Sequence, residues 1–269
     1  MKHYLSSLGA IEDAVCSAER ILIACDFDGT LCPIESSPAA VQLPETAAEC
    51  LRRLTESEGV TLAIISGRSL EDLSQRVPLD LICAGNHGLE IRCDGVIFKQ
   101  AGAVHLEPQM RVACEALGDV VSGWPGAWVE NKGLSATVHY RNLESPLTPS
   151  LLYSVRRKLA QLGGPFSYRA GKKAFELRPK VAWDKGSALR YIQERSGPFD
   201  LCICIGDDRT DESMFRANCG QLNIRVGCGR PSAATLYVSD PGETAILLDH
   251  VAASRGMAIG AGSRAAGHF

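Results

Sequence analysis

Short, largely apolar runs that each end at a polar loop constrain the fold of this chain more than any other feature. The first, Ile21–Cys25, contains no polar residue, and Val60–Ile65, Leu81–Ala84 and Leu201–Ile205 resemble it. A strand with one face in water alternates apolar and polar residues, so an unbroken apolar run is typical of a parallel strand buried on both faces. Amphipathic helical patterns follow the first two runs. This alternation predicts a doubly wound, Rossmann-like α/β core with a parallel sheet.

The middle of the chain follows a different pattern. Two helical segments, Glu107–Leu117 and one that begins at Pro149, are each followed by a pair of short extended runs. We expect this segment, residues 105–179, to be a separate, smaller α+β domain with antiparallel strands. It is inserted into the predicted core, which residues 1–104 and 180–269 form.

Composition excludes several classes of protein. The chain has 269 residues, of which 45% are hydrophobic and 22% charged, so a disordered chain is excluded. No apolar stretch approaches the roughly 18 residues of a membrane span. The net charge of −3 suggests neither a nucleic-acid nor a membrane partner, so any basic residue used for binding must act locally, at a pocket. Eleven cysteines without a CxxC pair, and no apolar segment near Met1, predict a reduced, cytoplasmic protein.

The strongest chemical feature is the segment Asp26-Phe27-Asp28-Gly29-Thr30-Leu31, which directly follows the first apolar run. Ligands of a doubly wound sheet bind beyond the carboxyl ends of its strands, where Asp26 and Asp28 are expected. A carboxylate oxygen of Asp26 and the backbone carbonyl of Asp28 suit a hard cation such as Mg²⁺. The Asp28 side chain then remains available for proton transfer. Two acids at this spacing also occur in ordinary turns. The other motifs of the chain therefore decide between an acidic turn and a site for a metal ion and a phosphate.

This segment resembles the DxDGT motif of the haloacid-dehalogenase (HAD) phosphohydrolases, and three further segments resemble the family's other motifs in the same order. Ser66, with Gly67 and Arg68 after it, ends the second run. Lys185 begins a helical segment. The last run ends in Gly206-Asp207-Asp208-Arg209-Thr210-Asp211-Glu212. The resemblance implies an HAD core with an inserted α/β cap.

The resemblance also implies roles for individual residues. Asp26 is expected to attack phosphorus and form an aspartyl-phosphate, and Asp28 to act as general acid and then general base. Ser66 and Lys185 are expected to hold the phosphate oxygens. Mg²⁺ is expected to bind to Asp26, to the Asp28 carbonyl and to Asp207. Two further acids in the last loop are expected to support the metal and Lys185: Asp208 and Asp211.

Four more segments resemble trehalose-6-phosphate phosphatases within that superfamily, and the resemblance covers residues 20–250. They are Gly85–Glu90, Val129–Ser135, Val138–Arg141 and Lys173–Pro179. The resemblance implies hydrolysis of trehalose 6-phosphate to trehalose and phosphate, with a separate synthase as the source of the substrate. The residues expected to bind this sugar phosphate are Gly67, Arg68, Asn86, His87, Glu130, Lys132, Arg141 and Glu176.

Several alternatives stay open at this point. An enzyme of the same build can act on another sugar phosphate, such as a sucrose- or mannosylglycerate-phosphate, and a phosphoryl-transfer mutase can share the core. A non-catalytic sugar-phosphate-binding module that regulates a synthase predicts loss of Asp26, Asp28 or Lys185, yet all three are present. Within the inserted segment, Glu130 and Lys132 can equally form a surface ion pair, and His139 suits a packed position in a sheet.

Overall fold

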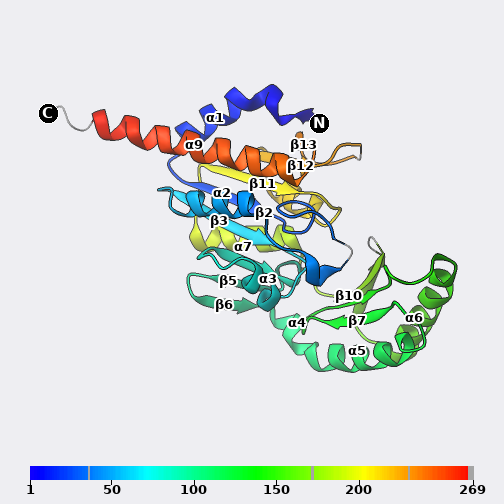
Figure 1. Ribbon diagram of the computed structural model, residues 1–269. Helices are drawn as coiled ribbons and strands as arrows, with labels where there is room; N and C mark the ends of the chain where they lie inside the picture. The colour runs from blue at the N-terminus through cyan, green and yellow to red at the C-terminus, as the bar shows by residue number, and fades with distance from the viewer. Residues whose placement is uncertain (36, 171–172, 230, 266–269) are drawn as a thin grey trace. The chain divides into compact units, whose positions relative to one another are not determined.

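The computed structural model describes residues 1–35, 37–170, 173–229 and 231–265 (Figure 1). The chain folds into two compact units. The first contains Met1–Phe98 and Trp183–Phe269, and the second contains Lys99–Ala182. No helix within the described part of the chain is both long and apolar enough to span a membrane.

The first unit is built on a nine-stranded sheet with the order β1-β13-β12-β11-β2-β3-β4-β5-β6. The strands from β1 to β4 in this order pair in parallel, and β5 pairs antiparallel with β4. The predicted α/β fold with a mainly parallel sheet is therefore confirmed. The strands are β1 (Lys2–His3), β2 (Ile21–Cys25), β3 (Val60–Ile65), β4 (Ile82–Gly85), β5 (Glu90–Cys93), β6 (Val96–Lys99), β11 (Leu201–Gly206), β12 (Leu222–Val226) and β13 (Leu236–Val238).

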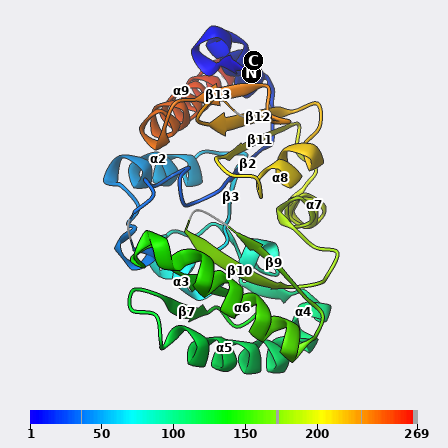
Figure 2. The ribbon, with the colours of Figure 1, turned by 90° about the vertical axis from the view of Figure 1, so that its right-hand side faces the viewer.

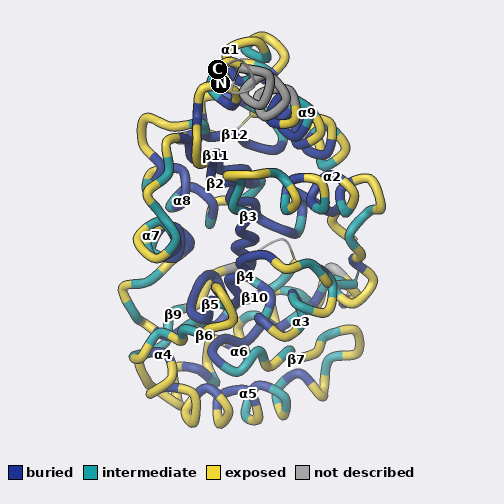
Figure 3. The backbone as a smooth tube through the Cα atoms, turned by 90° about the vertical axis from the view of Figure 1, so that its left-hand side faces the viewer, coloured by how far each residue is buried: buried dark blue, intermediate teal, exposed yellow. Residues whose placement is uncertain are grey.

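Helices cover both faces of this sheet, which explains the unbroken apolar sequence of β2. Ile21 and Ile23 pack into one core with α1, α2 and α9, whereas Leu22 and Ala24 pack into a second core with α7 and α8. Figure 3 shows the central strands as the most buried part of the unit. The helices are α1 (Leu8–Ser17), α2 (Glu45–Thr55), α3 (Leu70–Arg76), α7 (Lys185–Ser196), α8 (Glu212–Ala217) and α9 (Pro241–Ala265), with short 3₁₀ turns at Tyr4–Ser7, Pro38–Ala40 and Asn86–Gly88.

The second unit contains an antiparallel sheet with the order β7-β8-β10-β9, as predicted for the smaller α+β domain. The helices α5 and α6 accompany this sheet in the second unit (Figure 2). Phe175 and Leu177 on one face of β10 pack with the apolar stripes of these two helices. The intervening Glu176 lies on the opposite, polar face. The elements are α4 (Ala101–His105), α5 (Glu107–Val121), β7 (Trp128–Asn131), β8 (Ala136–His139), α6 (Thr148–Leu162), β9 (Phe166–Ala170) and β10 (Ala174–Pro179), with a 3₁₀ turn at Ser145–Leu147.

Candidate active site

The central strands bring the predicted motifs of the first unit to one edge of its sheet. β2 lies between β11 and β3, and all three are parallel, so the loops that follow them are neighbours. Asp26 follows β2 and donates its backbone N–H to the Ile205 carbonyl of β11 over 2.9 Å. Asp207 follows β11, and Ser66 follows β3. Side chains that are far apart in sequence therefore meet beyond the carboxyl ends of these strands.

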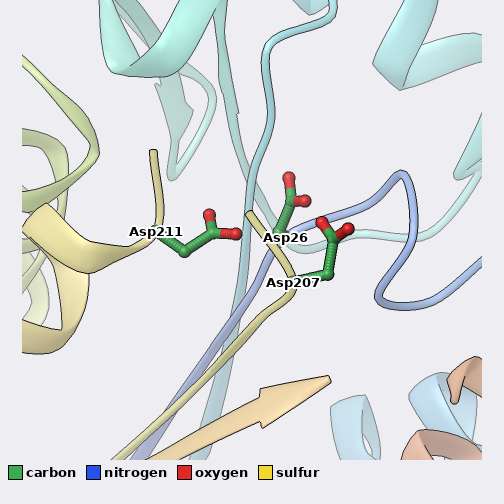
Figure 4. A group of neighbouring side chains, drawn as sticks. All are labelled: Asp26, Asp207 and Asp211. Atoms are coloured by element: carbon green, nitrogen blue, oxygen red, sulfur yellow. The ribbon is translucent and has the colours of Figure 1, made fainter. Parts of the chain in front are cut away.

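Three carboxylates meet at this edge (Figure 4). Asp26, Asp207 and Asp211 each offer an oxygen, and these oxygens lie within 4.8 Å of one another. The Asp207 side chain also lies directly against Gly29, which has a φ of +84°: a Cβ at this position would lie 2.6 Å from an Asp207 carboxylate oxygen. Only a glycine can occupy this position without displacing the Asp207 side chain.

Lys185, the first residue of α7, places its ammonium between two of these acids. Its Nζ donates to Asp26 Oδ1 over 2.6 Å and to Asp211 Oδ1 over 2.7 Å, and the Lys185 side chain is only 2% exposed. Burial disfavours the charge on Lys185, but Asp211 and Asp26 outweigh it and raise the pKa of the Lys185 ammonium. Asp211 also accepts the Asp208 backbone N–H through Oδ2 over 2.8 Å, so both of its oxygens are used to orient neighbours.

The charges of the cluster fit a divalent cation. Burial raises the pKa of the Asp26 carboxyl well above its usual value; Lys185 opposes this shift, and the charges of Asp211 and Asp207 add to it. Three carboxylates and one ammonium leave an excess of negative charge in a largely buried place. Hard oxygen ligands with excess negative charge are what Mg²⁺ prefers, so the residues present suit this ion.

Asp28, the predicted acid and base, is held by Arg68. Arg68 Nε donates to Asp28 Oδ2 over 2.7 Å, and Arg68 Nη2 donates to Asp28 Oδ1 over 2.6 Å. Arg68 Nη1 also donates to Asp72 Oδ2 over 2.6 Å. The family resemblance implies that Arg68 is a substrate ligand, and this stays a prediction. In the structure its guanidinium faces two carboxylates of the protein itself.

The segment Asn86–Gly88 is hydrogen-bonded to the loop that contains Ser66. The His87 N–H donates to the Ser66 carbonyl over 2.8 Å, and the Asn86 N–H donates to the Arg68 carbonyl over 2.6 Å. Asn86 and His87 both have positive φ, 49° and 58°, which costs free energy for residues other than glycine. A Cβ on Gly67 would lie 2.7 Å from the His87 ring, so the two residues are in direct contact.

Sequence reasoning missed two buried groups that support these loops. Glu90 accepts the Asn86 side-chain amide over 2.7 Å and the Leu70 N–H over 2.8 Å, which fixes the turn to the start of α3. Arg225 of β12 donates to Glu212 over 3.0 Å and to the Asp207 carbonyl over 2.5 Å. An arginine inside the buried run Leu222–Val226 is the signal that could have revealed the second support.

In the second unit, the predicted sugar ligands lie mainly on the polar face of the sheet. Glu130 and Glu176 are both opposite Thr137 in the strand register, so they lie on the same face on either side of β8. Glu130 is 2.7 Å from His139 Nε2 and 3.7 Å from Lys132 Nζ. Glu176 accepts from Arg178 Nε over 2.8 Å, and the half-buried Arg141 lies just beyond the end of β8.

His139 also stacks on Trp128, with ring centroids 4.3 Å apart. This contact and the bond to Glu130 give His139 a packed position in the sheet, as the sequence suggested. The polar face therefore presents carboxylates that are already oriented by cationic or aromatic neighbours.

A parallel α/β sheet with an acidic cluster beyond its central strands, and an inserted antiparallel α+β unit, defines an HAD-like protein. The family model described as trehalose-phosphatase matches residues 24–241. The chain belongs to this family.

Three relatives show how far the similarity extends. An uncharacterized glycosyl hydrolase of Mycobacterium tuberculosis is 41% identical over 209 residues, which cover 75% of this chain but only 15% of that protein. Probable trehalose-phosphate phosphatase E of Arabidopsis thaliana is 31% identical over 272 residues, which cover 93% of this chain and 76% of that protein. The crystal structure of a trehalose-6-phosphate phosphatase related protein superimposes with a TM-score of 0.77 at 29% identity and covers 86% of this chain and 97% of that one.

Proposed function

We propose that this protein is a Mg²⁺-dependent phosphatase that hydrolyses trehalose 6-phosphate to trehalose and phosphate. The observation that carries the proposal is the buried Lys185 ammonium, 2.6 Å from Asp26 and 2.7 Å from Asp211, beside Asp207. Family membership supplies the substrate class, a sugar phosphate. A separate synthase would supply trehalose 6-phosphate as the substrate.

The reaction has two halves. Asp26 attacks phosphorus and forms an aspartyl-phosphate, while the bond to the sugar oxygen breaks and Asp28 gives that oxygen a proton. In the second half, Asp28 accepts a proton from the attacking water, and the bond between phosphorus and Asp26 breaks to release phosphate. Ser66 and Lys185 hold the phosphate oxygens, and Asp208 and Asp211 keep Lys185 and the loop in place.

Three groups would hold the metal ion: the Asp26 carboxylate, the Asp28 carbonyl and the Asp207 carboxylate. When bound, Mg²⁺ supplies positive charge that offsets the repulsion between Asp26 and the phosphate. Phosphoryl transfer depends mainly on positioning and charge neutralisation. A site with excess buried negative charge is suited to hold the cation that would supply this neutralisation.

Sugar recognition is assigned to the inserted domain, which the sequence delimits at residues 105–179. Its polar sheet face offers Glu130, Lys132 and Glu176, and Arg141 follows β8. Carboxylates and cations form strong, directional hydrogen bonds with hydroxyl groups. In the first unit, the residues expected to contribute to substrate binding are Gly67, Asn86 and His87. A phosphatase of another sugar phosphate, of the sucrose- or mannosylglycerate-phosphate type, is the alternative.

Substrate preference tests the proposal. We expect release of phosphate from trehalose 6-phosphate to exceed release from glucose 6-phosphate, sucrose 6-phosphate and p-nitrophenyl phosphate, and EDTA to abolish it. Glu130→Gln and Glu176→Gln should each lower kcat/KM for trehalose 6-phosphate by about 10-fold to 100-fold, because a ligand of the sugar hydroxyls loses its charge. The same variants should leave turnover of p-nitrophenyl phosphate nearly unchanged.

Glu115→Gln is the matched control, because Glu115 is an exposed acid of the same unit whose ion pair with Arg111 lies at the surface. It should behave like the wild-type protein with both substrates. Preference for another sugar phosphate would reject the assignment to trehalose 6-phosphate, and equal losses with both substrates would reject the sugar-binding role of Glu130 and Glu176.

Thiol reagents give an independent prediction about the core. Burial, with a smaller effect from Asp26, raises the pKa of Cys25 to about 12, and burial with Asp28 raises that of Cys32 to about 12. Because the thiolate is the reactive form, both thiols should resist iodoacetamide in the folded protein. The exposed cysteines, Cys16, Cys219 and Cys228, should react first, and activity should persist. Mass mapping of labelled peptides checks this; inactivation that parallels labelling of Cys32 would contradict it.

A further inference from the structure

The guanidinium of Arg68 is almost fully occupied by partners within the protein. It makes two bonds to the Asp28 carboxylate, at 2.7 and 2.6 Å, one to Asp72 at 2.6 Å and one to the Pro38 carbonyl at 3.1 Å. Its central carbon also lies 5.5 Å from the centroid of the Phe27 ring. The Arg68 side chain is 8% exposed, whereas that of Asp28 is 36% exposed. Arg68 is therefore a buried clamp on a partly accessible carboxylate.

The direction of these hydrogen bonds limits what Asp28 can do while it is clamped. A guanidinium only donates, so both Asp28 oxygens act as acceptors in this arrangement. Each carboxylate oxygen has a second acceptor position, so a water can still donate to clamped Asp28. To donate a proton, Asp28 must instead carry a hydrogen on one of these oxygens. Protonation removes the negative charge and so weakens the two hydrogen bonds from Arg68. The clamped arrangement suits a proton acceptor and opposes a proton donor.

We infer that Arg68 is a positioning residue that holds Asp28 for the second half of the reaction, the hydrolysis of the aspartyl-phosphate. This inference rests on the proposed function. Clamped Asp28 accepts the proton of the attacking water, the new phosphorus–oxygen bond forms, and the electrons of the bond to Asp26 return to the Asp26 carboxylate. Asp28 then carries the proton, its pairing with Arg68 weakens, and it is released to protonate the next leaving oxygen.

Arg68→Met should therefore slow dephosphorylation more than phosphorylation. With p-nitrophenyl phosphate, whose leaving group needs no proton, we expect a rapid burst of p-nitrophenolate that approaches one equivalent of enzyme. The steady-state rate that follows should be about 10-fold to 100-fold below wild type, within the range that a general base contributes. KM should stay the same or fall, because a covalent intermediate accumulates. Intact-mass analysis after an acid quench should detect the phosphorylated protein.

Arg76→Met is the matched control. Arg76 is the last residue of α3, the helix that follows the Arg68 loop; it also binds Asp72, over 3.0 Å, and donates to the Val41 carbonyl. It should show no burst. Arg68→Lys, which keeps the charge but loses the two-point fork, should give a smaller burst and also serves if Arg68→Met folds poorly.

The possible outcomes distinguish a failure of the inference about Arg68 from a failure of the proposed function. A raised KM without a burst in the Arg68 variants would show that Arg68 binds the substrate phosphate and would overturn the inference. Equal effects in Arg76→Met would reduce Arg68 to a structural role and would also overturn it. Absence of phosphatase activity in the wild-type protein with every substrate would instead reject the proposed function.

Discussion

Asp26→Asn is expected to lower phosphate release from every accepted substrate by at least about 10⁴-fold, because the amide cannot attack phosphorus or form the aspartyl-phosphate. Asn is nearly isosteric with Asp and can still accept the bond from Lys185 Nζ. The loss should therefore be chemical and leave the fold intact. Initial rates with trehalose 6-phosphate and p-nitrophenyl phosphate measure the effect.

Stability measurements distinguish a loss of chemistry in Asp26→Asn from a loss of activity caused by misfolding. Asp26→Asn removes one of three neighbouring carboxylates, two of which are buried, so in EDTA its Tm should equal or exceed that of the wild type. Mg²⁺ should raise the Tm of the wild-type protein and raise that of the variant less, because a metal ligand has changed. Asp13→Asn, at an exposed acid on α1, should match the wild type throughout. An Asp26→Asn variant that retains substantial turnover would exclude Asp26 as the nucleophile.

The central half of the sheet could be predicted because its strands are buried on both faces. β2, β3, β4 and β11 contribute residues to the cores on both sides of the sheet, so their sequences are almost entirely apolar. The motif loops follow these strands directly, which is why their meeting at one edge could also be expected.

The strands between β11 and the β1 edge of the sheet could not be predicted in the same way. β1 has two residues, too few to show any period, and its pairing with β13 joins residues that are more than 230 positions apart. β12 does not read as a buried strand in the sequence, because Asn223 and Arg225 interrupt its apolar run. Their polar groups are satisfied by Asn218 and Glu212, which are partners that a local pattern does not reveal.

The same limit applies within the site. The positions of Asp28 and Arg68 in the sequence predict that both lie at the carboxyl edge of the sheet, but only the tertiary structure shows that they pair with each other. Glu90 was visible as part of Gly85–Glu90, yet its bond to the Leu70 N–H depends on the packing of β5 beside α3. Sequence motifs thus predict which groups gather, whereas hydrogen-bond partners depend on the tertiary fold.

Lys185→Met should produce the largest loss of stability. Lys185 is 2% exposed, and its removal leaves the carboxylates of Asp26 and Asp211 without their shared buried cation. Breaking a buried ion pair by removing one partner costs about 3–5 kcal/mol, which corresponds to a Tm lower by roughly 10 °C. Activity should also be lost, because the ammonium no longer holds the phosphate. Thermal unfolding in EDTA measures the first effect, and Lys180→Met, at an exposed lysine, is the control.

A second substitution separates the structural role of Lys185 from its chemical role. Lys185→Met/Asp211→Asn removes the ammonium together with a carboxylate that it neutralises, so the double variant should regain much of the Tm lost in Lys185→Met. Phosphate release should remain as low as in the single variant, since the neutral amide introduced at position 211 restores no cation beside Asp26. Recovery of activity along with Tm would mean that Lys185 only balances the charge of Asp211. A double variant less stable than Lys185→Met would mean that Asp211 stabilises the loop through its bond to the Asp208 N–H more than it destabilises the cluster by its charge.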